Sequence, residues 1–148
     1  FRDLGYELLE QRMADGVPVK PGALELVAWA KGAGVPVGVA TSTRRHRAQH
    51  HLQRVGLLKQ LDLLVTRDDV VDAKPAPEPY LTAAGLLGVA PEAALAAEDS
   101  ANGVRSAAAA GVPVLMVPDL LAPTDELRAL AHAVVPDLHA VLAALTGG

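Results

Sequence analysis

Residues 93–110 read AALAAEDSANGVRSAAAA, and this stretch decides the fold class. Its first five residues form a small apolar run of strand length, and residues 101–110 are an alanine-rich stretch of helical length. Glu98 and Asp99 lie between the two, at the carboxyl end of the expected strand, where open α/β sheets bind ligands. The stretch therefore predicts a buried strand, two carboxylates at its end, and a helix capped by Ser100.

The same alternation of strand-length apolar runs and helical stretches continues along the chain. It is typical of β–α units wound around a parallel sheet, so the predicted class is α/β with a Rossmann-like sheet. Helical spacing and stop signals place helices at residues 1–13, 23–31, 44–55, 78–87, 101–110, 124–131 and from 137 onward. Buried strands are expected at residues 35–40, 61–66, 93–97, 112–117 and 133–135.

Composition bounds the class of protein and its partners. A chain of 148 residues that is 51% hydrophobic and 20% charged corresponds to one folded domain. The net charge of −4 without a basic face argues against a nucleic-acid partner, so a small anionic substrate has to be bound locally. The sequence has no cysteine and no apolar run of the roughly 18 residues that span a bilayer, and the cytoplasm is the expected location.

Three hydroxyl residues end the strand expected at 35–40. Thr41, Ser42 and Thr43 offer hydroxyl and backbone N–H groups at the start of a helix, an arrangement suited to holding a phosphate. The alternative interpretation is a cap for the following helix. The two roles are compatible, so this cluster alone does not decide between them.

Lys74 lies in the sequence DAKPAPE at residues 72–78. Closely spaced prolines make this loop stiff and fix the direction of one cation. We expect Lys74 to neutralise charge on a phosphoryl group. The alternative is a solvated surface lysine beside a loop that is required for other reasons.

Glu98 and Asp99 repel each other unless a cation or a shared proton relieves the two adjacent charges. Mg²⁺ takes one or two protein carboxylates and leaves its other positions to water and substrate phosphate, which matches this sparse ligand set. The alternative is an exposed loop that caps the next helix. Asn102 and Gly103 follow, and the glycine lets the backbone approach a bound group closely.

The histidines are not interpreted as a metal site. His46 and His50 are four residues apart on one expected helix face, but they lie among several arginines. A solvated basic helix face explains this pattern better than a ligand pair does.

The sequences VATST (39–43), AKPAP (73–77) and AEDSANG (97–103) closely resemble, in order and spacing, three motifs of the haloacid dehalogenase-like hydrolases. The branch resembled is that of β-phosphoglucomutase-like and phosphoglycolate-phosphatase-like proteins. The resemblance implies that residues 1–16 contain the last helix of a helical cap and that residues 17–148 form the core domain.

The resemblance also implies an activity and a set of roles. The activity is Mg²⁺-dependent phosphoryl transfer on a small phosphorylated metabolite, through an aspartyl-phosphate. Thr41 would hydrogen-bond the phosphoryl group, Lys74 would neutralise it, and Asn102 would support the site. Asp99 with Glu98 would hold Mg²⁺. A receiver domain, which also uses acids, a hydroxyl and a lysine, is a weaker alternative because here the lysine precedes the acids.

One departure from the family is serious, because no Asp-x-Asp sequence occurs in this chain, so the motif that carries the nucleophile is absent. In the family that motif ends the central strand, between the strands expected here at 35–40 and 93–97. Removing it would leave two strands about 10 Å apart with unpaired backbone groups. We therefore expect a fragment of a longer protein that is inactive alone, or else a sheet that closes differently or borrows a strand. A non-catalytic module that binds phosphate and metal is the second functional hypothesis.

Overall fold

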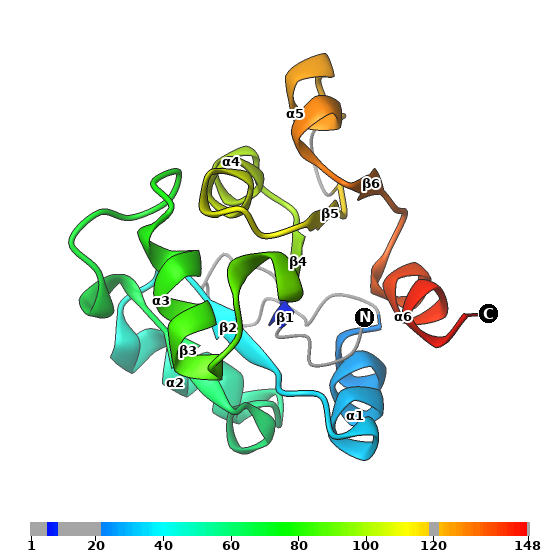
Figure 1. Ribbon diagram of the computed structural model, residues 1–148. Helices are drawn as coiled ribbons and strands as arrows, with labels where there is room; N and C mark the ends of the chain where they lie inside the picture. Colours follow the sequence, from blue (N-terminus) through cyan, green and yellow to red (C-terminus); the bar gives the residue numbers. More distant parts are fainter. Residues whose placement is uncertain (1–5, 9–21, 119–121, 148) are drawn as a thin grey trace.

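A computed structural model describes residues 6–8, 22–118 and 122–147 of the chain. Within them, parallel strands form a six-stranded sheet in the order β3-β2-β1-β4-β5-β6, with helices packed on both faces (Figure 1). The predicted α/β class with a Rossmann-like parallel sheet is confirmed. The strands are β1 (Tyr6–Leu8), β2 (Gly38–Ala40), β3 (Leu63–Val65), β4 (Leu95–Glu98), β5 (Val114–Met116) and β6 (Ala133–Val134).

After β1, the described helices follow the predicted order. They are α1 (Ala23–Ala33), α2 (Arg45–Arg54), α3 (Glu78–Leu87), α4 (Ala101–Ala110), α5 (Asp125–Leu130) and α6 (Leu138–Thr146), with short 3₁₀ turns η1 (Leu58–Gln60), η2 (Arg67–Asp69) and η3 (Pro91–Ala93). Regular pairing in β2 begins later than expected, because the N–H of Val37 donates to the Asp62 carboxylate (2.7 Å) instead of to a neighbouring strand. Tertiary hydrogen bonds of this kind set strand ends that hydrophobic runs alone do not mark.

The position between β2 and β4 departs most from the expectation. Residues Tyr6–Leu8 form β1 there, and Glu7 lies opposite Gly38 on one side and Ala96 on the other. The prediction of an empty central position is therefore wrong, and so is the prediction of a helix at these three residues. Pairing removes the cost of unpaired N–H and C=O groups on both neighbouring strands, and that gain outweighs a weak helical spacing in a short segment.

The rest of the predicted 1–13 helix lies outside the described residues, as does most of the loop before α1. The assignment of residues 1–16 to a cap remains a prediction there, whereas β1 is part of the core sheet. The central position is therefore filled by residues of this chain, in the place that the central strand has in the family, and the expectation of a fragment remains a prediction.

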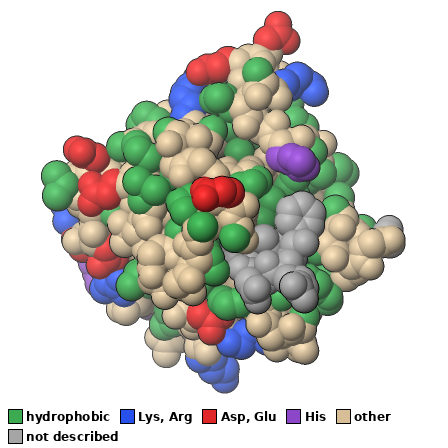
Figure 2. All heavy atoms as spheres, viewed as in Figure 1, with side chains coloured by type: hydrophobic (Ala, Val, Ile, Leu, Met, Phe, Trp, Pro, Cys, Tyr) green, Lys and Arg blue, Asp and Glu red, His purple; other side chains and the backbone are tan. Residues whose placement is uncertain are grey.

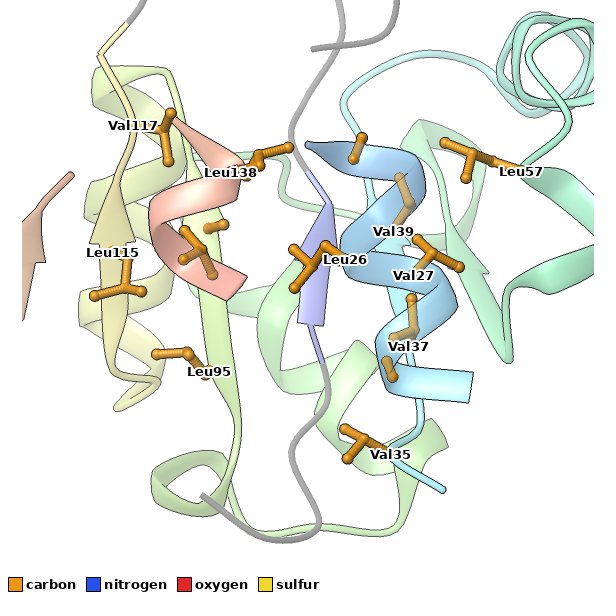
Figure 3. Close-up of a cluster of buried hydrophobic side chains, with 14 of the residues drawn as sticks. Leu26, Val27, Val35, Val37, Val39, Leu57, Leu95, Leu115, Val117 and Leu138 are labelled. Carbon is orange, nitrogen blue, oxygen red and sulfur yellow. The ribbon is translucent and has the colours of Figure 1, made fainter. Parts of the chain in front are cut away.

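Side chains of the inner strands alternate between two apolar clusters, one on each face of the sheet. Leu95 and Ala97 face the cluster covered by α1 and α6, whereas Ala94 and Ala96 face the cluster covered by α3 and α4. Figure 3 shows Leu26 of α1 and Leu138 of α6 on the first of these clusters. Burial on both faces explains why the strands appear in the sequence as continuous apolar runs.

Candidate active site

The carboxyl ends of β2 and β4 are joined by one buried lysine. The ammonium of Lys74 donates to the carbonyl oxygen of Ala40, which ends β2 (2.9 Å), and to Oε2 of Glu98, which ends β4 (2.5 Å). The lysine side chain is 1% exposed and the glutamate side chain is 0% exposed. A buried ion pair is tolerated only when its geometry is good and its remaining hydrogen-bonding groups also have partners. The contacts of Lys74 therefore hold the carboxyl ends of β2 and β4 at a fixed separation.

The Glu98 carboxylate has further partners on both of its oxygens. Tyr80 of α3 donates its hydroxyl to Oε2 (2.5 Å), and Ser100 Oγ lies 3.4 Å from Oε1. Gly103 leaves the room that this carboxylate occupies, because a Cβ built at that position would lie 1.8 Å from Oε1. The glycine expected to admit a bound group therefore admits a side chain of the protein itself.

The loop that carries Lys74 is tied at both ends. Glu78, the first residue of α3, accepts the N–H groups of Asp72 (2.9 Å) and Val71 (3.0 Å), and these bonds lower the pKa of its carboxyl. Ser106 of α4 donates to the carbonyl oxygen of Ala76 (2.6 Å). The peptide bond between Lys74 and Pro75 is cis. The loop is thus held by α3 and α4, in addition to being stiffened by its prolines.

Thr41 is 3% exposed and lies directly beyond β2. Its N–H donates to the carbonyl oxygen of Val65 (2.9 Å), and its Oγ1 accepts the N–H of Thr43 (3.2 Å). A hydroxyl that accepts this bond keeps its own proton to donate to a ligand. Ser42 and Thr43 are half-buried beside it.

The cap of α2 differs from the alternative interpretation of this cluster. Arg44 occupies the N-cap position, without a side-chain capping bond. Asp68 instead accepts the N–H of Arg45 (2.8 Å) from across the loop and pairs with Arg44. Two hydrogen bonds lower the pKa of the Asp68 carboxyl: the one from the Arg45 N–H has the larger effect, and the one from the Arg44 guanidinium the smaller. None of the three hydroxyl residues therefore serves as the capping side chain of α2.

Asp99 and Ser100 form the step from β4 into α4. Asp99 is half-buried, and Ser100 caps α4 by accepting the N–H of Gly103 (3.0 Å), as the sequence predicted. Asn102 is exposed and accepts from Arg105 Nη1 (3.3 Å). In the described part of the chain, Asn102 is not brought together with Lys74 and Glu98.

The residue types at the end of β4 suit a hard cation. Glu98, which is buried, and Asp99, which is half-buried, follow one another in the sequence, and Mg²⁺ typically uses one or two carboxylates together with water and phosphate oxygens. No group of three or more histidine, cysteine, aspartate and glutamate side chains suited to a metal occurs among the described residues. Any ion bound here would thus rely on oxygen ligands from outside this set.

Sequence reasoning missed Tyr80, Glu78 and Ser106 as parts of the site. Tyr80 and Ser106 are common residues on helix faces whose partners lie 18 and 30 positions away in the sequence. Glu78 bonds to N–H groups six and seven positions before it, and a glutamate in the first turn of a helix gives no sign of that contact. The available signal was the place of Tyr80, two residues into the helix that follows the lysine loop.

On the face shown in Figure 2, acidic and basic side chains are interspersed among hydrophobic and other groups. None of the described helices has both the length and the apolar character needed to cross a membrane.

Comparison with known proteins places these motifs. Residues 3–111 match the family model of the haloacid dehalogenase-like hydrolases. Validoxylamine A 7'-phosphate phosphatase of Streptomyces hygroscopicus subsp. limoneus is 40% identical over 112 residues, which cover 76% of this chain and 51% of that protein. Phosphorylated carbohydrates phosphatase of Thermotoga maritima is 38% identical over 112 residues, with 76% and 52% covered.

Among solved structures, a Thermotoga maritima protein assigned as a β-phosphoglucomutase aligns with a TM-score of 0.79 at 33% identity. The alignment covers 86% of this chain and 59% of that one. The chain thus spans about half the length of the curated relatives that it matches.

Proposed function

This chain belongs to the haloacid dehalogenase-like hydrolases, in the branch of β-phosphoglucomutase-like and phosphoglycolate-phosphatase-like proteins, and from that premise we propose that it carries the phosphate and Mg²⁺ pocket of a phosphoryl-transfer enzyme. The proposed substrates are small phosphorylated metabolites, of the kind that the names of its relatives describe. Hydrolysis and intramolecular transfer both remain within the proposal.

One observation carries the proposal most directly. A buried ammonium, that of Lys74, is held between the ends of β2 and β4 and lies next to the residue that precedes Thr41. A fixed positive charge in a site sheltered from water stabilises the negative charge that develops on a transferring phosphoryl group. Thr41, Ser42 and Thr43 would supply the hydrogen bonds that orient the group.

Asp99 and Glu98 are the proposed Mg²⁺ ligands. When bound, Mg²⁺ would neutralise phosphoryl oxygens and orient them for in-line attack. Glu98 would serve in this way through Oε1, whose contact with Ser100 Oγ is long (3.4 Å), because Lys74 and Tyr80 both donate to Oε2. Asn102 would act only from the rim of the site, given its exposed position and its contact with Arg105.

Transfer by the route of this family needs a nucleophilic aspartate, and we propose that it comes from outside the 148 residues, which contain no Asp-x-Asp. A carboxylate oxygen of that aspartate would bond to phosphorus while the bond to the leaving oxygen breaks and a general acid protonates that oxygen. Water would then attack phosphorus and release the carboxylate and phosphate. Throughout, Lys74 and Thr41 would hold the phosphoryl oxygens.

A second candidate is a module that binds phosphate and Mg²⁺ without turnover. The lack of Asp-x-Asp favours it. The two candidates differ only in whether a nucleophile reaches the site, so they share the binding predictions and differ in turnover.

The binding part is tested by isothermal titration of the full chain with orthophosphate, with and without Mg²⁺. Lys74→Ala should weaken phosphate binding at least about tenfold, whereas Lys31→Ala removes an exposed lysine paired with Asp62 and should leave it unchanged. Equal affinities in the two variants would reject the site. Circular dichroism confirms that each variant is folded.

The turnover part is tested on protein isolated from its own cells. Its denatured mass is measured together with Mg²⁺-dependent release of orthophosphate from a panel of sugar and polyol phosphates. A mass above 15.3 kDa with turnover supports the enzyme. A 15.3 kDa species that binds phosphate without turnover supports the binding module, and turnover by that species would refute a nucleophile from outside the chain.

A further inference from the structure

We propose that Tyr80 is a positioning residue, which fixes the Glu98 carboxylate so that Oε1 is held for Mg²⁺ while Oε2 stays with Lys74. The inference rests on the proposed function and deepens it, because it assigns the orientation of a proposed metal ligand to a residue outside the family motifs quoted above.

Tyr80 contacts both members of the buried ion pair. Its side chain is in α3, the residue is 3% exposed, and its hydroxyl donates to Glu98 Oε2 (2.5 Å). The face of its ring lies toward the ammonium of Lys74, with Nζ 5.4 Å from the ring centroid, a distance at which cation and ring attract. One side chain thus limits the movement of the carboxylate and of the cation together.

A carboxylate has two equivalent oxygens, and it binds a metal well only when one of them already points toward the metal position. Here two donors, an ammonium and a phenol, converge on Oε2. On the other side, Oε1 lies over Gly103 and near Ser100 Oγ. The donors therefore fix the plane and the direction of the carboxylate. A half-turn would give the same arrangement, because the two oxygens are equivalent, whereas any smaller rotation would strain both bonds from Lys74 and Tyr80.

Packing alone does not account for the hydroxyl. The Tyr80 ring forms one wall of a small apolar cavity that is also lined by Gly38, Ala84, Leu87 and Val112. A phenylalanine ring would line these neighbours equally well. The hydroxyl is accounted for by its bond to Glu98, which is the reason to assign it a role at the site.

Substitution of the hydroxyl should affect metal binding more than folding. Second-layer groups that orient a ligand change metal affinity by about 10- to 100-fold when removed. For Tyr80→Phe we expect Mg²⁺ to bind about tenfold more weakly, and we expect the Glu98 carboxylate to rotate or to occupy more than one orientation. Thr66→Val is the matched control, because it removes another buried hydroxyl at constant shape, one that bonds to Asp69 and not to Glu98.

The experiment measures two quantities on the full chain and on both variants. Crystal structures without metal give the orientation of the Glu98 carboxylate, and calorimetric titration with Mg²⁺ alone gives the affinity. A rotated carboxylate with weaker Mg²⁺ binding in Tyr80→Phe, and neither change in Thr66→Val, is the expected result. An unchanged carboxylate overturns the positioning role, and a rotated carboxylate with unchanged affinity overturns its link to the metal.

Two other outcomes are an absence of Mg²⁺ binding and a Tyr80→Phe variant that does not fold. If the unsubstituted chain binds no Mg²⁺, the proposed metal site fails, while the structures of the variants still decide whether Tyr80 orients Glu98. If Tyr80→Phe does not fold, p-aminophenylalanine and p-methylphenylalanine at position 80 replace it, because they are alike in size and only the first keeps an N–H donor. Equal carboxylate orientation in these two proteins would then refute the proposal.

Discussion

Gly103→Ala tests the buried charge arrangement with the smallest change available. The new methyl carbon would lie 1.8 Å from Glu98 Oε1 and 2.1 Å from its Cδ, so the carboxylate has to move. Gly85→Ala is the matched control, since it also replaces a glycine inside a helix, and nothing lies within 4 Å of the added carbon. Comparison of the two variants separates the effect on Glu98 from the general effect of alanine in a helix.

The expected changes in the free energy of unfolding have opposite signs in the two variants. Alanine in place of glycine stabilises a helix by roughly 0.5–1 kcal/mol, which is the whole expectation for Gly85→Ala. In Gly103→Ala the same gain is opposed by displacement of Glu98 from Lys74 and Tyr80, and breaking a buried pair costs about 3–5 kcal/mol. We therefore expect a net loss of about 2–4 kcal/mol in Gly103→Ala, a large share of a typical total of about 5–15 kcal/mol.

Urea unfolding followed by far-ultraviolet circular dichroism at 25 °C gives the free energy of unfolding of each variant. The two variants should fall on opposite sides of the unsubstituted chain. A Gly103→Ala protein as stable as Gly85→Ala would mean that Glu98 does not lie over this glycine, and the arrangement described for the site would be refuted.

Three more outcomes follow from the same contacts. Lys74→Met should lose about 3–5 kcal/mol of unfolding free energy by leaving Glu98 unpaired, and the double variant with Glu98→Leu should recover a measurable part of that loss in urea denaturation. The pKa of Glu78 is lowered by loop N–H groups, that of Asp72 foremost, so its stabilising effect is present above the unfolded pKa near 4.5 and is lost as pH falls through the lower folded value. Urea midpoints of Glu78→Gln should therefore change less than those of the unsubstituted chain between about pH 5 and pH 2, and parallel pH curves would contradict this reasoning. Ser106→Ala should cost about 1–2 kcal/mol, because it leaves a loop carbonyl without its donor, and thermal unfolding with no change in midpoint would reject that bond.

The parts of the fold that the sequence predicts well are those fixed by local pattern. The helix at 78–87 was predicted with its observed bounds, and Ser100 was predicted as a cap, since both depend on residues a few positions apart. The central strand was not predicted, because the three residues of β1 pair with partners about thirty and about ninety positions away. Pairing over such distances leaves no periodic signal in the segment itself.

The candidate site divides in the same way. Lys74 and Glu98 were chosen for their chemistry and their place after strands, and the structure brings these two together. Tyr80 was not chosen, because a tyrosine on an apolar helix face is usually a packing residue and only its partner gives it a further role. Asn102 was chosen by resemblance, and its observed contact is with Arg105 instead.

The close approach of Gly103, Glu98, Lys74 and Tyr80 also constrains how this protein can change over generations. Each of these four residues fits the other three, and replacing any one of them leaves a clash, an unpaired charge or a broken hydrogen bond. A single replacement therefore lowers stability before a second change can compensate. Drift through one-residue steps should therefore be slow here. Where the arrangement is lost, we expect the four positions to change as a group, with the glycine free to vary only after the glutamate has gone.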